Sequence, residues 1–361
     1  MNSTQIEIQL IAVVVAAACA LPGVFLVLRR MSLMSDAISH SILLGIVLAF
    51  FVVKDLASPI LVIAAALTGV LTVSLVELLN KTELVKEDAA IGLVFPVLFS
   101  IGVILISRFA GDIHLDIDAV LLGELAFAPF NRFEPFGYDI GPLTLYVMAG
   151  ILLLNLLFIL FFYKELKIAT FDPGLAASIG FSPALIHYAL MSLVSITAVG
   201  AFDAVGSILV VALIIAPPTA AYLMTDDLKW LIILSAIIGI LSAITGYWGA
   251  HILDVSIAGS MATMTGVFFM FSFLLAPKRG MVSIFNRRSR QKWEFAIKML
   301  VVHLCQHENL PEAKEESRID HLQRHFRWEE DFASKVVRKA EKSGELTAAG
   351  GVMELTDKGR Q

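Results

Sequence analysis

The stretch Met31–Phe50, MSLMSDAISHSILLGIVLAF, decides how the rest of the chain is interpreted. It is mainly apolar and has the length of about 20 residues that a helix needs to cross a bilayer. Asp36 and His40 lie inside it, and residues four apart share one face of a helix. Ionisable groups at membrane depth are costly and usually face a cavity or one another. The stretch therefore predicts a hydrated path with a cation-binding point.

A carboxylate oxygen and a neutral imidazole nitrogen together suit a divalent transition metal better than Mg²⁺ or K⁺. Ser39 lies near the same helix face and is a further candidate for the pathway. The alternative is structural, with Asp36 capping backbone amides near the helix end and His40 bonded to a neighbouring helix. These residues alone leave both interpretations open.

The composition is that of a membrane protein. Of 361 residues, 58% are hydrophobic, and the mean hydropathy of +0.81 excludes ordinary soluble domains. Only two cysteines, Cys19 and Cys305, are present, so we expect no disulfide framework. We predict an all-α polytopic protein of eight or nine transmembrane helices. The candidate spans are roughly 8–28, 33–53, 57–79, 89–108, 142–163, 184–202, 204–224, 229–250 and 255–276.

Charge divides the chain into two parts. Residues 1–277 hold 10 Lys and Arg against 19 Asp and Glu, a net charge of −9. Residues 278–361 hold 17 against 13, a net charge of +4. We therefore predict a transmembrane domain over residues 1–285 and a small soluble domain over residues 290–361.

Basic residues orient the spans, because loops rich in Lys and Arg stay in the cytoplasm. They gather in alternate loops, so nine spans place the N-terminus outside and the C-terminal domain in the cytoplasm. The cytoplasmic set is Arg29, Arg30, Lys81, Lys86, Lys164, Lys167, Lys229, Lys278, Arg279, Arg287, Arg288, Arg290 and Lys292, against Lys54, Arg108 and Arg132 outside.

The outer loop 109–141 is acidic, and an acidic mouth raises the local concentration of cations. Any one of these residues alone is better explained as an ordinary solvated loop residue. We interpret His251 and Asp254, near the same side, as loop residues rather than metal ligands. The outer-loop residues are Asp112, His114, Asp116, Asp118, Glu124, Glu134 and Asp139.

The inner loop 164–183, KELKIATFDPGLAASIGFSP, predicts a short helix. Asp172 is a good N-cap and Pro173 a good first helical residue. Small residues (Ala176, Ala177 and Gly180) line one side, which favours a docking element over a plain amphipathic loop helix. No GxxxxGK[ST] motif occurs anywhere in the sequence, so a partner chain must hydrolyse any ATP that transport uses.

The segment GAFDAVGSILVVALIIAPPTAAYL, residues 200–223, holds Asp203 and the pair Pro217–Pro218. Proline inside a span frees a backbone carbonyl and bends the helix. Broken helices line cavities in transporters, although a kink that only shapes packing fits equally well. We place Asp203 near the outer end of its span, as a possible pathway residue.

Residues 290–361 predict a helix, a second helix and a hairpin with a Gly-Gly turn, an α+β arrangement similar to a winged helix. Basic residues on the second helix are better explained as solvated than as nucleic-acid contacts. His303 and His307 have metal-compatible spacing, as do His321 and His325, although we place all four on exposed helices.

Three separated segments in the same order resemble the membrane subunit of the ABC-type manganese, zinc and iron uptake permeases. MSDAISHSILLGIVLAF resembles the Gly-Asp-Ala-x-Ser-His segment of that family, with Ser35 at the usual glycine. FDAVGSILVVALIIAPPTAAYLMTD and YWGAHILDVSIAGSMATMTG resemble its manganese and iron branch. The resemblance covers roughly residues 8–280, and the C-terminal extension is similar to the winged-helix tails of longer relatives.

The resemblance implies a permease of the bacterial inner membrane with no covalently bound cofactor. Asp36 and His40 match positions expected to contact Mn²⁺, Zn²⁺ or Fe²⁺ in transit. Residues 172–183 match the coupling helix, within which we single out Asp172, Pro173, Gly174, Ala177 and Gly180. The implied partners are membrane lipid, two cytoplasmic ATP-binding subunits, an extracytoplasmic metal-binding lipoprotein, and a second permease subunit, identical or a sister.

Two other classes of function stay open. An ion-coupled secondary transporter would need no ATPase, and such proteins often contain inverted repeats, of which we find no convincing example here. A membrane-anchored metal sensor would act through its C-terminal domain. Removing residues 290–361 separates the classes, because a transporter keeps some uptake whereas a sensor loses its whole function.

Overall fold

The computed structural model describes residues 2–54, 58–109, 125–134, 139–308, 311 and 313–360. The chain separates into two compact units, Met1–Gly280 and Met281–Gln361. The sequence-based boundary, between residues 285 and 290, lies a few residues later. Each unit has its own hydrophobic core and is described by itself.

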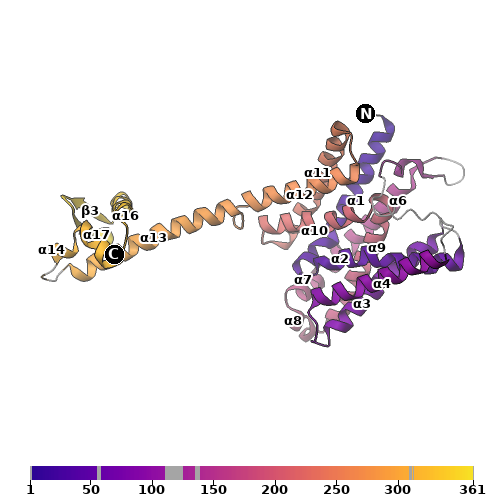
Figure 1. Cartoon of the computed structure of the whole chain (residues 1–361), viewed down its shortest axis with the longest axis horizontal. Coiled ribbons are helices and arrows are strands. Elements are labelled where there is room, and N and C mark those ends of the chain that lie inside the picture. The colour runs from indigo at the N-terminus through magenta and orange to yellow at the C-terminus, as the bar shows by residue number, and fades with distance from the viewer. Residues whose placement is uncertain are drawn as a thin grey trace. The chain divides into compact units, whose positions relative to one another are not determined.

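Unit Met1–Gly280 is a bundle of helices (Figure 1). Within the described ranges, nine of its helices are long and apolar enough to cross a membrane, which agrees with the predicted fold class. These are α1 (Ser3–Leu28), α2 (Ser32–Val53), α3 (Pro59–Asn80), α4 (Glu87–Phe109), α6 (Leu143–Phe161), α9 (Pro183–Val205), α10 (Ser207–Met224), α11 (Leu228–Leu253) and α12 (Ile257–Leu275). Shorter elements are η1 (Ala128–Phe130), β1 (Arg132–Phe133), β2 (Gly141–Pro142), α7 (Tyr163–Phe171) and α8 (Pro173–Ser178).

Helix α1 lies at the centre of this unit. In its most apolar window 78% of the residues are buried, against 17% in α6 and in α12. It packs against α6, α9, α10 and α11. At Gly23 the backbones come close, since a Cβ atom there would lie 2.0 Å from the Ile214 carbonyl oxygen of α10. Small residues allow such close approaches between membrane helices.

A proline inside α1 is matched by an asparagine on α6. Pro22 has no N–H, so the Ala18 carbonyl one turn earlier loses its helical partner. The Asn155 side chain, which is fully buried, donates to that carbonyl at 2.8 Å and to the Thr197 hydroxyl at 3.0 Å. This network joins α1, α6 and α9 through polar groups that cannot reach water.

Of the two interpretations left open for Pro217–Pro218, the structure favours the unbroken helix, because α10 runs through both prolines. The Ile214 carbonyl, freed by Pro218, is the oxygen that packs onto Gly23. The interruption falls instead at Gly206, the single residue between α9 and α10. Its φ of 79° and ψ of 164° form a backbone conformation that suits glycine.

A charged clamp holds the small β1–β2 hairpin to the start of α1. Arg132 lies 2.8 Å from Glu7 and 2.8 Å from Asp139. The Arg132 guanidinium holds the pKa of the Asp139 carboxyl below its usual range. Five of the expected acidic-mouth residues, Asp112, His114, Asp116, Asp118 and Glu124, lie outside the described residues.

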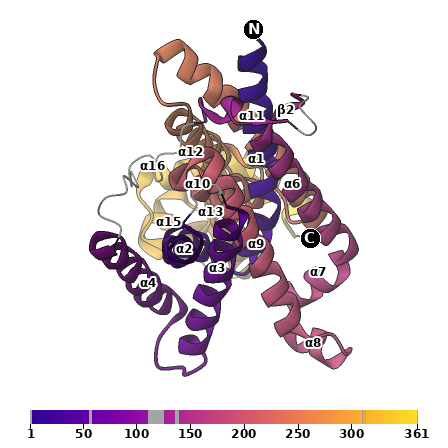
Figure 2. The same cartoon turned by 90° about the vertical axis from the view of Figure 1, so that its right-hand side faces the viewer.

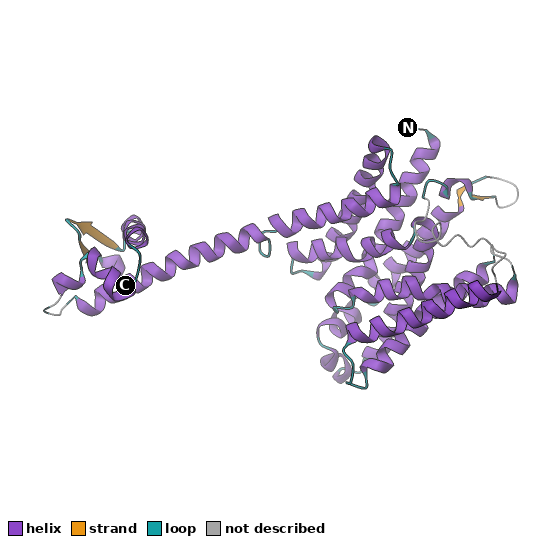
Figure 3. Ribbon diagram, viewed as in Figure 1, coloured by secondary structure: helices purple, strands orange, loops and turns teal. Residues whose placement is uncertain are grey.

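Unit Met281–Gln361 combines helices with one antiparallel hairpin, drawn as orange strands in Figure 3. Strands β3 and β4 are joined through Gly350 and Gly351, with φ of 59° and 82°, which is the Gly-Gly turn predicted from the sequence. Its winged-helix character stays a prediction. The elements are α13 (Met281–His307), α14 (Ala313–Glu316), α15 (Ile319–Phe326), α16 (Glu330–Ser343), β3 (Leu346–Ala349), β4 (Val352–Leu355) and α17 (Asp357–Arg360).

We predict that Asn155→Leu destabilises the membrane unit by about 1–3 kcal/mol, because the Ala18 carbonyl is left buried without a donor. Adding Pro22→Ala restores a backbone N–H for that carbonyl, so the double variant should recover part of the loss. Thermal unfolding of the detergent-purified protein measures this double-mutant cycle. Strictly additive effects of the two substitutions would contradict the assignment of Asn155 to the proline-freed carbonyl.

Candidate functional site

Asp36 and His40 lie together on α2, as the four-residue spacing predicts. His40 Nε2 is 3.3 Å from Asp36 Oδ1. With a rise of about 1.5 Å per residue, the two Cα atoms lie about 6 Å and 12 Å beyond the start of the helix. The side chains are 39% and 30% exposed, so they are neither sealed in the core nor fully open.

Helix α2 packs between α3 and α4 (Figure 2), and α4 provides the aromatic neighbours of His40. The imidazole stacks on Phe95, with ring centroids 5.9 Å apart, and meets the edge of Phe99 at 6.0 Å. These contacts help to position the ring beside Asp36. The sequence did not indicate the two phenylalanines, because they belong to another helix.

Two serines beside the pair are buried. Ser39 is 2% exposed, and its hydroxyl donates to the Ser35 carbonyl at 2.9 Å, so its hydrogen is committed to the backbone. Ser35 is fully buried, and its hydroxyl has no hydrogen-bond partner. Ser35 was noted only for replacing a glycine, and its unpaired hydroxyl is a polar group that the sequence did not reveal.

The pair offers one carboxylate oxygen and one imidazole nitrogen on a half-open flank. Two ligands form a shallow site compared with the four of a structural zinc site. Remaining positions on a bound ion would be filled by water or by groups of another subunit. Such an arrangement can hold a cation briefly and release it.

Asp203 belongs elsewhere in the bundle. It is exposed and lies on the last turn of α9, two residues before the helix ends at Val205. The end of α9 is the outer one in the predicted orientation, whereas Asp36 is near the inner end of α2. The structure therefore separates Asp203 from the pair along the membrane normal in that orientation.

His251 and Asp254 line a cavity of about 450 Å³ at the turn between α11 and α12. The His251 ring stacks on Tyr247, with centroids 6.5 Å apart. Asp254 has φ of 53°, the left-handed conformation of a residue that ends a helix. Other lining residues, among them Ile8, Leu125 and Phe127, come from α1 and the segment before η1.

The inner loop forms two helices, α7 and α8. Asp172 caps α8 by accepting a hydrogen bond from Leu175 N at 2.9 Å, and Pro173 is its first residue, as predicted. The predicted extent of 172–183 is wrong, because α8 ends at Ser178. Gly180 follows in a left-handed conformation with φ of 94°, which terminates the helix.

The five predicted coupling residues, Asp172, Pro173, Gly174, Ala177 and Gly180, are all exposed. The small-residue face is not uniformly free, because Ala176 is fully buried in a cluster with α1 residues such as Phe25. What α8 and its flanks present to the outside are larger apolar side chains. Phe171, Leu175 and Ile179 are 60%, 51% and 55% exposed.

Arg29, at the end of α1, connects this loop to the helix that precedes Asp36 and His40. Its Nε donates to the Thr170 hydroxyl of α7 at 3.2 Å, and its NH1 lies 3.4 Å from His187 Nδ1 of α9. Burial lowers the pKa of Arg29 to about 10, which still leaves it charged at neutral pH. Only Arg30 and Met31 separate Arg29 from the first residue of α2.

In the C-terminal unit, the expectation that the four histidines lie on exposed helices is wrong for His303, which is 4% exposed. His307 Nδ1 lies 2.8 Å from the His303 carbonyl oxygen of its own helix. His303 instead groups with His321 and with Glu316, a residue that the sequence did not single out.

Residues 3–276 of the chain match the model of the ABC 3 transport family. The chain is 49% identical over 353 residues to "Zinc transport system membrane protein TroD" of Treponema pallidum, covering 98% of this chain and 96% of that protein. It is 51% identical over 271 residues to "Manganese transport system membrane protein MntD" of Bacillus subtilis, covering 75% and 92%. The solved structure of PsaBC from Streptococcus pneumoniae, in complex with Fab, superimposes with a TM-score of 0.64 at 30% identity, covering 77% and 94%.

Proposed function

The chain belongs to the ABC 3 transport family and is the membrane permease subunit of a metal transporter, and we propose that it imports Mn²⁺ or Zn²⁺ past Asp36 and His40. The observation that carries this proposal is the pair itself. A carboxylate and an imidazole 3.3 Å apart on a bilayer-length helix form a ligand set for such ions.

The partial exposure of the pair supports a site shared with a second permease subunit. Exposed fractions of 39% and 30% at membrane depth are costly against lipid. A second membrane subunit, identical or a sister, would remove this cost and enclose a hydrated path. An extracytoplasmic metal-binding lipoprotein would deliver the ion to the outer mouth.

The exposed apolar surface of α8 supports docking of a cytoplasmic ATP-binding subunit. Phe171, Leu175 and Ile179 would lose water contact on docking, which is favourable for apolar side chains. No phosphate-binding motif occurs in this chain, so its own role is non-catalytic and the partner hydrolyses ATP.

Arg29 and the packing of Ala176 could transmit a movement of α8 to Asp36 and His40. A shift of α8 would reach α1 through the hydrophobic cluster that holds buried Ala176 and, via α7, through the Thr170–Arg29 hydrogen bond. The end of α1 leads into α2 after three residues. Closure of the ATP-binding subunits would thereby reorient the helix that carries Asp36 and His40.

We expect Asp36→Ala and His40→Ala each to lower metal uptake by at least about 10-fold, since each removes a direct ligand and losing even a supporting group costs 10–100-fold. Uptake of radioactive Mn²⁺ and Zn²⁺ by cells expressing the whole transporter measures this. Asp88→Ala, on the exposed first turn of α4, is the matched control and should keep full uptake. Unchanged uptake in both pair variants at normal protein levels would remove the proposed site.

Replacing Leu175 with Ser should weaken the docking of the ATP-binding subunit while the bundle stays folded, because the side chain is 51% exposed in the free chain. The measurement is co-purification of that subunit with the permease, together with ATP-dependent uptake in proteoliposomes. Leu84→Ser is the control, since Leu84 is 87% exposed in the α3–α4 loop, on the same predicted side. Equal losses for both variants, or uptake without ATP, would contradict the coupling role.

A further inference from the structure

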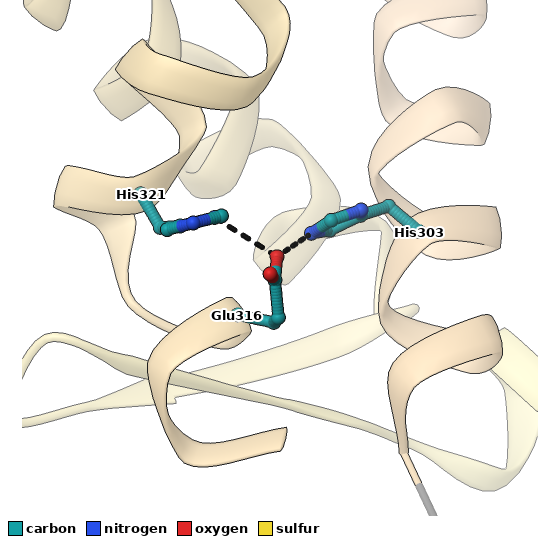
Figure 4. A group of neighbouring side chains, drawn as sticks. All are labelled: His303, Glu316 and His321. Atoms are coloured by element: carbon teal, nitrogen blue, oxygen red, sulfur yellow. Dashed lines mark ion pairs between the residues drawn. The ribbon is translucent and has the colours of Figure 1, made fainter. Parts of the chain in front are cut away.

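Three side chains from three different helices meet in the C-terminal unit. His303 comes from α13, Glu316 from the end of α14 and His321 from α15, and one possible ligand atom of each lies within 4.8 Å of the others. Figure 4 shows the two imidazoles on either side of the carboxylate. A single oxygen, Glu316 Oε2, lies 3.2 Å from His303 Nε2 and 2.9 Å from His321 Nδ1.

These same three atoms are buried and have no hydrogen-bond partner. The His303 side chain is 4% exposed, and Glu316 is 15% exposed. The two nitrogens instead lie within ion-pair distance of Glu316 Oε2. A buried polar atom without a partner costs about 1–3 kcal/mol, so three such atoms at one point need a common explanation.

Further imidazoles surround the group. The His307 and His325 rings lie 4.5 Å and 4.6 Å from the His303 ring, between centroids. Neutral imidazole is the form that binds metal.

We propose that His303 Nε2, Glu316 Oε2 and His321 Nδ1 bind a divalent transition metal ion in the C-terminal unit. Two imidazole nitrogens and a carboxylate oxygen form a zinc ligand set that leaves a further position open for water. Affinity for such nitrogen and oxygen ligands rises from Mn²⁺ to Zn²⁺. The site therefore prefers Zn²⁺ over Mn²⁺.

A bound ion would crosslink α13, α14 and α15 beside the core of this unit. Leu304 and Leu322, which directly follow His303 and His321, are buried core residues, as is Leu300 three residues before His303. An ion that binds the folded unit and not the unfolded chain stabilises the fold by linkage. The stability of the C-terminal unit would thus respond to metal. This inference does not rest on the proposed role of Asp36 and His40 in transport.

The test uses the full-length chain with Asp36→Ala and His40→Ala, so that the membrane pair contributes no metal. After chelation and dialysis against Zn²⁺, the bound metal is counted, and Co²⁺ absorption reports the coordination geometry. We expect one Zn²⁺ per chain, a higher unfolding temperature of the C-terminal unit with Zn²⁺, and weaker retention of Mn²⁺.

Glu316→Gln keeps the shape of the side chain and should abolish both the bound zinc and its stabilising effect. Glu315→Gln, one residue earlier and exposed, is the matched control and should keep both. Should Glu316→Gln fail to fold, His321→Ala with the Co²⁺ spectrum gives the same decision. Zinc binding that is equal in the Glu316 and Glu315 variants, or absent from the parent, would overturn this proposal and leave the transport proposal unaffected.

Discussion

The membrane unit depends on the hydrogen bond from Asn155 to the Ala18 carbonyl. Pro22 opens the most buried helix at that carbonyl, and no water can reach it. Backbone groups in such surroundings must be paired within the protein. One donor from α6 therefore allows α1 to carry a proline at the centre of the bundle. A second proline-freed carbonyl, that of Ile214 on α10, packs closely against Gly23 of α1.

Against this background, the openness of Asp36 and His40 is informative. Asn155 and Thr197 are fully buried and hydrogen-bonded, whereas this pair remains partly exposed on a helix flank. Two aromatic rings pack against the imidazole. The arrangement is rigid enough to present ligands and incomplete enough to release an ion. The incomplete ligand set, rather than the rigidity, is what would distinguish a transport site from a structural one.

The sequence could predict what depends on local pattern. Hydropathy predicted the spans, spacing placed Asp36 beside His40, and Asp172–Pro173 predicted the start of α8. What depended on distant partners was missed. Glu316 has no recognisable spacing to His303, and whether α10 breaks at Pro217–Pro218 depends on how the neighbouring helices accept its freed carbonyls. The exposure predicted for His303 failed for the same reason, since its burial depends on neighbours from α15, among them His325 and Phe326.

Gly206 is the only residue between α9 and α10, so the two helices cannot move independently of one another. A longer connection would let each tilt alone and absorb the difference in the loop. Here any change in the direction of one axis must be taken up by rotation about two backbone bonds or passed on to the other helix. The angle between the axes of α9 and α10 therefore depends on the two backbone torsions of Gly206, and a tilt of one helix is transmitted to the other.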